Sequence, residues 1–220
     1  MNPSSGLYEL RLYVARPTTF PVMLEKWTSH HYAIYPDFHV VPGVFVARRG
    51  GEACDAEPTG IALLLQHEDR AAVDRSMAAL IASDRMNQVP GPPGTTYVDH
   101  WERTFLHPLD ISGFGGEATG THAYEFRKYV AGDGHLEELM AEWEMPDRPT
   151  FAGPGSVLGA FVSQPEKYEP DGVALLVRHE QAAESDDLEA RFPLPTPQRS
   201  ASVERIERTI LSPTNFSDMQ

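Results

Sequence analysis

The chain contains two copies of one sequence pattern, and this repetition constrains its fold more than any other feature. The segment YELRLYVA at 8–15 returns as YEFRKYVA at 124–131, and GVFV at 43–46 returns as GAFV at 159–162. Further along, GIALLLQHE has the counterpart GVALLVRHE, and ERTFLHPLDIS has the counterpart ERTILSPTNFS. Four blocks in the same order indicate a tandem repeat, which has to be recognised before single elements are assigned.

Each copy has the pattern strand, helix, strand, strand, helix, strand. Residues 8–14 predict the first strand, because apolar and polar side chains alternate along them. One face carries Tyr8, Leu10, Leu12 and Val14, and the other carries Glu9, Arg11 and Tyr13. Residues 20–35 predict one continuous helix, because apolar and aromatic positions recur at helical spacing. These positions are Phe20, Leu24, Trp27, His31 and Tyr35.

The remaining elements of the first copy follow the same logic. Residues 40–49 and 60–68 are β-rich and predict an antiparallel pair, and residues 96–106 alternate as a last strand. Asp69 is the expected N-cap of the second helix. The apolar stripe of that helix consists of Val73, Met77, Leu80 and Ile81.

This element order is that of a ferredoxin-like unit. A four-stranded sheet with helices on one face needs cover on the other, so two units can pack sheet to sheet and close a barrel with the helices outside. The predicted class is therefore α+β, with two tandem ferredoxin-like repeats forming one α/β barrel. We expect repeat 1 over residues 1–109, a linker over 110–121, and repeat 2 over 122–220 with a shortened second helix.

The charge and the cysteine content limit the binding partners and the cellular compartment that we expect for this chain. The chain has 18 Lys and Arg against 32 Asp and Glu, a net charge of −14, which repels nucleic acid and anionic membranes. The one cysteine, Cys54, allows no internal disulfide, and no apolar run reaches the ~18 residues that span a bilayer. We expect a cytoplasmic protein. A barrel within one chain needs no dimer but does not forbid a homodimer.

The opening YELRLYVARPTTFPVMLEKW, the ending ERTFLHPL and their repetition resemble the NIPSNAP family. The resemblance covers residues 7–109 well and 122–213 more weakly, and SDRMN near Asp84 lacks a tryptophan usual in the family. The resemblance implies the dimeric α/β-barrel fold. The wider superfamily includes cofactor-free monooxygenases, cyclases, isomerases, decarboxylases and haem enzymes, so it barely narrows the chemistry.

The second copy serves as an internal reference. Residues kept in both copies most simply support the shared fold. They include Glu9 with Glu125, Arg11 with Arg127, Trp27 with Trp143, His67 with His179, Glu102 with Glu207 and Arg103 with Arg208. If the Glu9 and Arg11 face points into the barrel, the charges of both copies could form one cluster. His67 and Glu68 are adjacent on a strand, so they point to opposite faces and cannot pair with each other.

Residues present in one copy are the better candidates for chemistry. Pro146 and Pro149 are expected to end the helix early in the second copy, so the first copy alone continues past its tryptophan with His31 and Tyr35. We predict His31 as the acid/base and Tyr35 as the group that orients substrate or stabilises an enolate. The alternative is that both are hydrogen-bonded core residues.

Four further residues are predicted to bind substrate. The aromatic walls are Trp27, Tyr97 and Trp101, with His39 beside them. Residues 87–96 are a flap or a connector. A metal site of His31, His39 and Asp37 would need the chain to fold back, and its spacing matches no familiar pattern. No dinucleotide, ATP or zinc motif is present, so we expect neither metal nor cofactor.

The leading hypothesis is a cofactor-independent enzyme of secondary metabolism. It would use a His/Tyr pair for cyclisation, isomerisation or elimination on a small apolar, aromatic or polyketide-like molecule. Two alternatives stay open: a cofactor-free monooxygenase on the same class of substrate, and a non-catalytic ligand-binding protein.

Overall fold

The computed structural model describes most of both repeats. The described residues are 6–31, 34–50, 60–83, 97–109, 122–144, 156–166, 168–179 and 202–214. Within these ranges the side chains of residues 30, 31, 49, 50, 143, 144 and 156 are not described. The predicted linker at 110–121, the segment 87–96 and the expected last helix of the second copy at 181–192 lie outside the described residues.

The described chain contains eight strands. Those of the first half are β1 (Leu7–Val14), β2 (Val40–Gly50), β3 (Gly60–His67) and β4 (His100–Pro108). Those of the second half are β5 (Ala123–Ala131), β6 (Ser156–Pro165), β7 (Gly172–His179) and β8 (Val203–Pro213). Helical segments lie between them: α1 (Phe20–Lys26), η1 (Trp27–His31), η2 (Tyr35–Asp37), α3 (Arg70–Ala82) and α4 (Leu136–Glu144).

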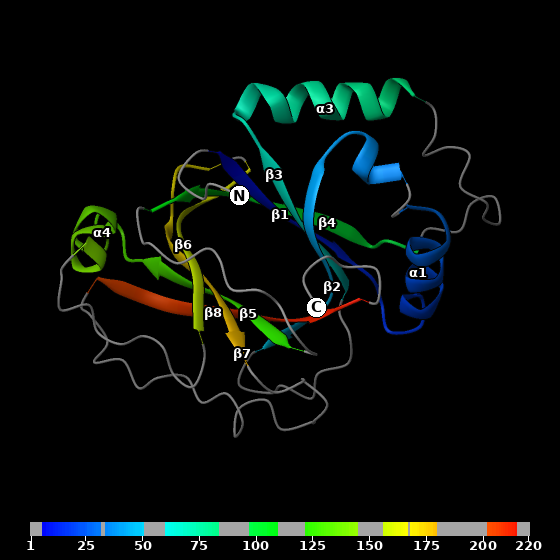
Figure 1. Cartoon of the computed structure of the whole chain (residues 1–220). Coiled ribbons are helices and arrows are strands. Elements are labelled where there is room, and N and C mark those ends of the chain that lie inside the picture. Colours follow the sequence, from blue (N-terminus) through cyan, green and yellow to red (C-terminus); the bar gives the residue numbers. More distant parts are fainter. Residues whose placement is uncertain are drawn as a thin grey trace.

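The strands form one closed antiparallel barrel in the order β1-β3-β2-β8-β5-β7-β6-β4. Each half contributes four neighbouring strands in the same order, with its first strand at the centre beside its third and fourth. The halves join where β2 pairs with β8 and where β4 pairs with β6. Figure 1 shows the barrel with α1, α3 and α4 on its outside. The predicted fold class, two ferredoxin-like units closed as one barrel, is confirmed.

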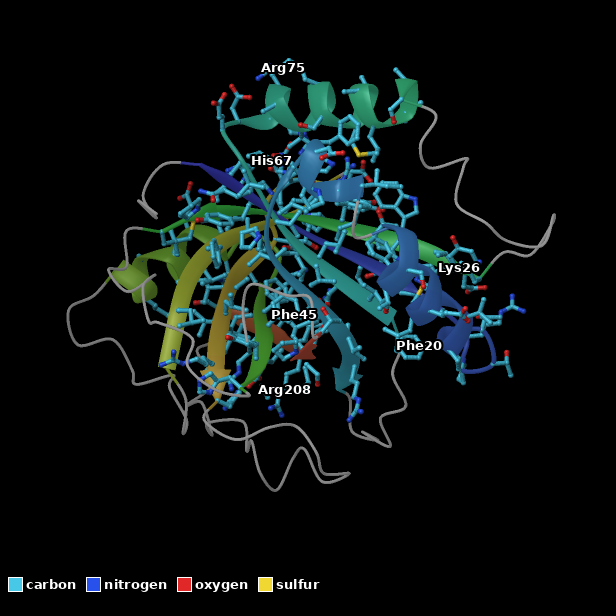
Figure 2. The ribbon with its side chains drawn as sticks, turned by 45° about the vertical axis from the view of Figure 1, so that its right-hand side comes forward. Phe20, Lys26, Phe45, His67, Arg75 and Arg208 are labelled. Carbon is cyan, nitrogen blue, oxygen red and sulfur yellow. The ribbon has the colours of Figure 1, made fainter. Side chains whose placement is uncertain are left out.

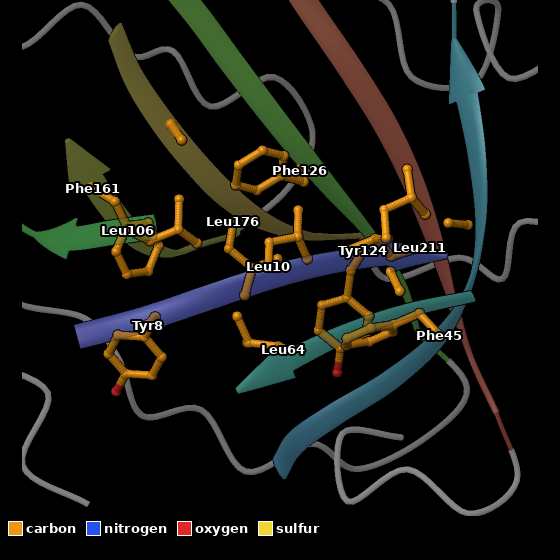
Figure 3. Packing of buried hydrophobic residues seen from close by; sticks show 14 of the residues in the cluster. Tyr8, Leu10, Phe45, Leu64, Leu106, Tyr124, Phe126, Phe161, Leu176 and Leu211 are labelled. Carbon is orange, nitrogen blue, oxygen red and sulfur yellow. The ribbon is translucent and has the colours of Figure 1, made fainter. Parts of the chain in front are cut away.

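An apolar cluster lies inside the barrel, and both halves contribute to it. Tyr8 and Leu10 of β1 pack there with Phe126 and Leu176 of the second half (Figure 3). The rings of Phe45 and Tyr124 meet edge to face across the join between the halves, with centroids 5.6 Å apart. Because side chains alternate along a strand, the face of β1 with Glu9 and Arg11 points outward, toward the helices. The idea that these charges enter the barrel as one cluster is therefore wrong.

The expected helix over residues 20–35 is not continuous. It is α-helical to Lys26, forms a π-helical turn at Trp27–His31, and is followed by a 3-10 turn at Tyr35–Asp37. The hydroxyls of Thr28 and Ser29 bond to the carbonyl oxygens four residues earlier, at 2.7 Å each, and such bonds compete with the regular helix. Trp27 and Tyr35 nevertheless both become buried.

The second helix of the first copy agrees with its pattern except at one position. The carboxylate of Asp69 accepts a hydrogen bond from the backbone N–H of Ala72 at 2.7 Å, which confirms the N-cap. Val73 and Leu80 are buried, whereas Ile81 is 72% exposed, so its place in the apolar stripe was wrong. Among the described residues, none of the helices combines the length and apolar character needed to cross a bilayer.

Candidate functional site

A buried ionic cluster lies on the outer face of β1. The carboxylate of Glu9 accepts from the Nε of Arg11 at 2.6 Å, and the Nε of Arg103 lies 2.9 Å from the same oxygen. The second carboxylate oxygen is 3.0 Å from Nε2 of His67. Arg103 also reaches Glu166 of the second half at 2.8 Å. His67 therefore pairs with Glu9 across the sheet, and not with its neighbour Glu68.

The second half repeats this cluster on β5. The carboxylate of Glu125 accepts from Arg127 and from Arg208, with Nε–O distances of 2.7 Å each, and lies 3.1 Å from His179. Figure 2 labels His67 on the side of the barrel beneath α3 and Arg208 on the opposite side. The conserved pattern between the two copies thus produces two separate clusters rather than one shared cluster.

Electrostatics favour the charged form of both glutamates. Burial alone would raise the pKa of Glu9, but the hydrogen bond from His67 and the charges of Arg11 and Arg103 outweigh it and lower the pKa to about 2. The pKa of Glu125 is lowered by the same kinds of neighbours against the same burial. Both oxygens of each glutamate have partners, and the clusters occur in both halves, so they support a structural role.

The first half adds a pair of tyrosines to its cluster. The hydroxyl oxygens of Tyr13 on β1 and Tyr35 on η2 lie 2.5 Å apart, and Nη1 of Arg11 lies 3.4 Å from the Tyr13 hydroxyl. Burial, followed by the neighbouring Tyr13, raises the pKa of Tyr35 well above its usual value, despite the opposing charge of Arg11. Tyr35 is thus a protonated donor in a buried layer beside a cation. In the sequence, Phe151 stands at the equivalent position of the second copy.

Aromatic rings surround this pair. The ring of Trp27 lies 5.1 Å from the ring of Tyr13 and 5.3 Å from that of Tyr35, centroid to centroid. Trp101 on β4 is 45% exposed, and its ring lies 5.9 Å from the guanidinium carbon of Arg11. Trp101 therefore occupies the solvent edge of the layer, while Trp27 forms its buried wall.

His39 lies directly beside Tyr35. Its backbone N–H donates to the carbonyl of Tyr35 at 2.9 Å, and this turn stacks the two rings with centroids 5.5 Å apart. Among the described residues, neither ring nitrogen of His39 has a hydrogen-bond partner, although the residue is 6% exposed. Burial, followed by the positive charge of Arg11 and the neighbouring His67, lowers the pKa of His39 to about 4. The imidazole is therefore neutral at physiological pH.

The structure describes the side chains of all predicted site residues except His31. Tyr35, Trp27, His39 and Trp101 lie in this layer, and Tyr97 packs against the same apolar cluster. The side chain of His31 lies outside the described residues, so its predicted role is untested.

The sequence comparison missed two members of the layer, Arg11 and Tyr13. Both are kept in the second copy, where Arg127 and Tyr129 stand. This assigned Arg11 to the shared fold, and Tyr13 was noted only for its strand face. In the first half, however, Tyr13 also contacts Tyr35, so one residue serves both the fold and the layer. The alternation of side chains along β1 could have pointed to Tyr13, because it places Tyr13 on the same face as Arg11.

The described cavity lies elsewhere, in the lumen of the barrel. It has a volume of about 380 Å³, and its wall contains Leu10, Leu12, Ala62, Glu102, Thr104, Phe126, Lys128, Ile206, Glu207, Arg208 and Thr209. Leu10 and Leu12 flank Arg11 on β1 and point to the opposite face, so the cavity and the tyrosine layer are separated by the sheet. Within the described ranges no group of three or more His, Cys, Asp or Glu side chains could hold a metal ion.

Fold and site define an α+β protein in which two ferredoxin-like halves close into one barrel, with an aromatic and ionic layer beneath the helices of the first half. The chain matches no protein-family model and no curated protein.

Solved structures share its fold over almost the whole chain. An anthrone oxidase-like protein has a TM-score of 0.57 at 12% identity, with coverage of 96% of this chain and 92% of its own. A protein of Fusobacterium nucleatum described as a candidate monooxygenase has a TM-score of 0.56 at 10% identity, with coverage of 97% of this chain and 94% of its own. A protein of Lactobacillus acidophilus, also described as a candidate monooxygenase, has a TM-score of 0.52 at 10% identity, with coverage of 95% of this chain and 94% of its own. Identities this low establish the fold alone, and the NIPSNAP resemblance stays a prediction.

Proposed function

We propose that this chain is a cofactor-free monooxygenase that acts on an enolisable aromatic molecule in the layer beneath the helices of the first half. The observation that carries the proposal is the Tyr13–Tyr35 hydroxyl pair beside Arg11, with the neutral imidazole of His39 stacked on Tyr35. These groups combine a proton acceptor with donors for an oxyanion, which is what abstraction of a proton next to a carbonyl requires.

His39 is the proposed proton acceptor. It is neutral at physiological pH, because burial and then the charge of Arg11 and the neighbouring His67 lower its pKa to about 4. Taking up a proton there is unfavourable in the absence of a substrate. When a substrate enolate forms at the same time, its negative charge offsets Arg11 and stabilises the imidazolium. Proton transfer is thereby coupled to formation of the anion.

Tyr35, Tyr13 and Arg11 are the proposed oxyanion donors. The raised pKa of Tyr35, caused first by burial, keeps its phenol protonated and able to donate. Arg11 adds a fixed positive charge that is 1% exposed and held in place by Glu9. Preorganised donors in a buried layer act more strongly than donors in water. Trp27 and Trp101 would stack on the flat rings of the substrate.

The oxidation balances without another reactant. His39 removes a proton from an activated methylene, and the resulting carbanion passes an electron to O₂. The two radicals combine to a peroxide anion, which takes the proton back from the imidazolium of His39. The hydroperoxide formed in this way loses water to give the ketone. The net reaction is R₂CH₂ + O₂ → R₂C=O + H₂O, in which the carbon loses four electrons and the two oxygen atoms gain them. The names of the neighbours with the same fold, monooxygenase and anthrone oxidase-like, support this version of the chemistry.

Proton transfer without oxygen is the second candidate, because the same groups also suit cyclisation, isomerisation or elimination. It differs from the first in one respect, the consumption of O₂. A third possibility is a ligand-binding protein, in which the layer holds the aromatic molecule and no turnover occurs. His31 remains an alternative proton acceptor, as predicted from the sequence.

The test uses anthrone as the probe, with an oxygen electrode and a blank without enzyme. We expect one O₂ consumed for each anthrone, with kcat lowered by about tenfold or more in Tyr35→Phe and in His39→Gln, as is usual for loss of an oxyanion donor or a general base. His135→Gln is the matched control, because His135 is an exposed histidine of the second half. Loss of activity in His31→Gln but not in His39→Gln would move the base to His31. Binding without O₂ consumption would contradict the oxygenase.

A further inference from the structure

The cavity inside the barrel is separate from the proposed reaction layer. Its volume of about 380 Å³ lies within the range of roughly 300–1,000 Å³ that is usual for small-molecule sites. The part formed by Leu10, Leu12, Ala62 and Phe126 is apolar. A ligand here would therefore place an apolar body against the core of the barrel, on the far side of β1 from Tyr13 and Tyr35.

The polar wall of the cavity comes from equivalent positions of the two halves. Glu102 and Thr104 of β4 correspond in the repeat to Glu207 and Thr209 of β8, and all four line the cavity. In the strand order, β4 and β8 are separated by three strands on either side, so they lie opposite one another across the lumen. Two carboxylates and two hydroxyls thus border the cavity from opposite walls.

One residue breaks the symmetry of the lumen. Lys128 of β5 stands where the first copy has Leu12. Its ammonium group lies 2.6 Å from Asp171 and 3.5 Å from Glu207, and its side chain is 9% exposed. Arg208 also borders the cavity, but its Nε donates to Glu125 on the outer face at 2.7 Å. Lys128 is therefore shared between Asp171 and Glu207, with the shorter contact to Asp171.

Each glutamate also contacts a basic residue two positions earlier on its own strand. Arg205 donates to Glu207 at 2.9 Å, and His100 lies 3.1 Å from Glu102. Arg205 is 53% exposed, and the side chains of Glu102 and Glu207 are 40% and 46% exposed, so water screens these pairs. A cation inside the lumen would be less hydrated and would interact more strongly with the same carboxylates. The net charge of −14 adds to this preference.

We propose that the lumen binds a small organic cation, a primary ammonium group on a compact apolar or aromatic body. The ammonium lies between Glu102 and Glu207, with the hydroxyls of Thr104 and Thr209 as further acceptors. The body packs on the apolar part of the wall, between Leu12 and Phe126. This site uses none of the residues of the proposed reaction layer, so its test is independent of the test of the proposed function.

The test compares two probes of similar size and opposite charge, 2-phenylethylammonium and 3-phenylpropanoate. Calorimetric titration and the heat-denaturation midpoint are measured on the full chain. We expect the ammonium to bind and to raise the midpoint, and the carboxylate to do neither. The double variant Glu102→Gln/Glu207→Gln should weaken ammonium binding by about tenfold or more, as expected when close charge pairs are lost.

Two further variants keep the result interpretable. Glu204→Gln removes one exposed charge from the same strand, also bonded to Arg205, but outside the cavity wall, and should leave binding unchanged. Ala62→Leu fills the lumen without changing a charge and should abolish binding, while its own denaturation midpoint reports whether it folds. Binding of neither probe, preferred binding of the carboxylate, or full ammonium binding by the double variant would overturn the proposal.

Discussion

The hydroxyl oxygens of Tyr13 and Tyr35 lie 2.5 Å apart, and they join a strand that both halves share to a segment that differs between them. Tyr13 also contacts Arg11, whose guanidinium is fixed by the buried Glu9. The repeated ionic cluster therefore serves as the support on which the first half places its distinctive aromatic groups. This relationship explains how a symmetric fold can present an asymmetric site.

Replacing Tyr35 by Phe removes this hydrogen bond and leaves the ring in place. We expect a loss of about 1 kcal/mol in the free energy of unfolding, the usual scale for one hydrogen bond whose partner stays bonded elsewhere. Urea denaturation of wild type and Tyr35→Phe measures it. Tyr168→Phe, at a residue that is 72% exposed, is the control and should not change stability. Equal stability of Tyr35→Phe and wild type would show that the pair contributes nothing to folding.

His39 should make stability depend on pH. Its pKa is about 4 in the folded protein against an ordinary value of 6.5, so the unfolded chain binds a proton more readily. The stability is fully present above about pH 6.5 and is lost as the pH falls toward 4, by a total on the order of 3 kcal/mol. In His39→Phe this contribution disappears, so the difference between variant and wild type should change over that range. Parallel pH profiles of the two proteins would contradict the prediction.

We expect a similar loss of stability when either ionic cluster loses its glutamate. Glu9→Gln leaves Arg11 and Arg103 buried without their carboxylate, and Glu125→Gln does the same to Arg127 and its neighbours. We expect each variant to lose about 3–5 kcal/mol in the free energy of unfolding, the usual cost of breaking a buried ion pair on one side. Chemical denaturation of both variants measures this. A loss below about 1 kcal/mol, typical of surface ion pairs, would contradict the buried role.

Two glycines begin equivalent strands under the same steric limit. A Cβ atom at Gly60 would lie 2.2 Å from the carbonyl oxygen of Tyr13, and one at Gly172 would lie 2.0 Å from that of Tyr129. Both contacts are with backbone, which cannot move aside without opening the barrel. We expect Gly60→Ala and Gly172→Ala each to lose about 3 kcal/mol or more, at the upper end of overpacking effects. Thermal denaturation measures this.

Gly132→Ala is the control for that pair, because the nearest atom to its Cβ would be 3.4 Å away on the side chain of His135. It should be tolerated. If all three variants unfolded at the same temperature, the close approach at the strand starts would not be real.

Comparison of the two copies predicted the architecture because the relevant signals are local and repeated. Alternation along β1 and the N-cap at Asp69 each depend on a few neighbouring residues, and both are present in the structure. The helix over residues 20–35 was predicted less well. Hydroxyl bonds from Thr28 and Ser29 compete with the backbone there, and average spacing does not register such competition.

The site could be predicted only in part. Tyr35, Trp101 and His39 were selected because the second copy has other residues at these positions. Trp27 was selected as an aromatic wall although both copies keep it, and these four lie in one layer. Arg11 was set aside because both copies keep it, and Tyr13 was noted only for its face of the first strand. Comparing the inner faces of β1 and β5 in the same way would have drawn attention to Lys128. This residue of β5 stands where β1 has Leu12.

The sequence by itself determined that two ferredoxin-like units exist and which faces of their strands are apolar, because periodicity and repetition are properties of the chain. Tertiary structure decided which face of β1 points inward, and hence that Glu9 and Glu125 form separate clusters beneath the helices. It also decided that β4 and β8 lie opposite each other around a lumen. These relations depend on how the edge strands of the two halves pair, which brings together residues far apart in the chain and leaves no local signal in the sequence.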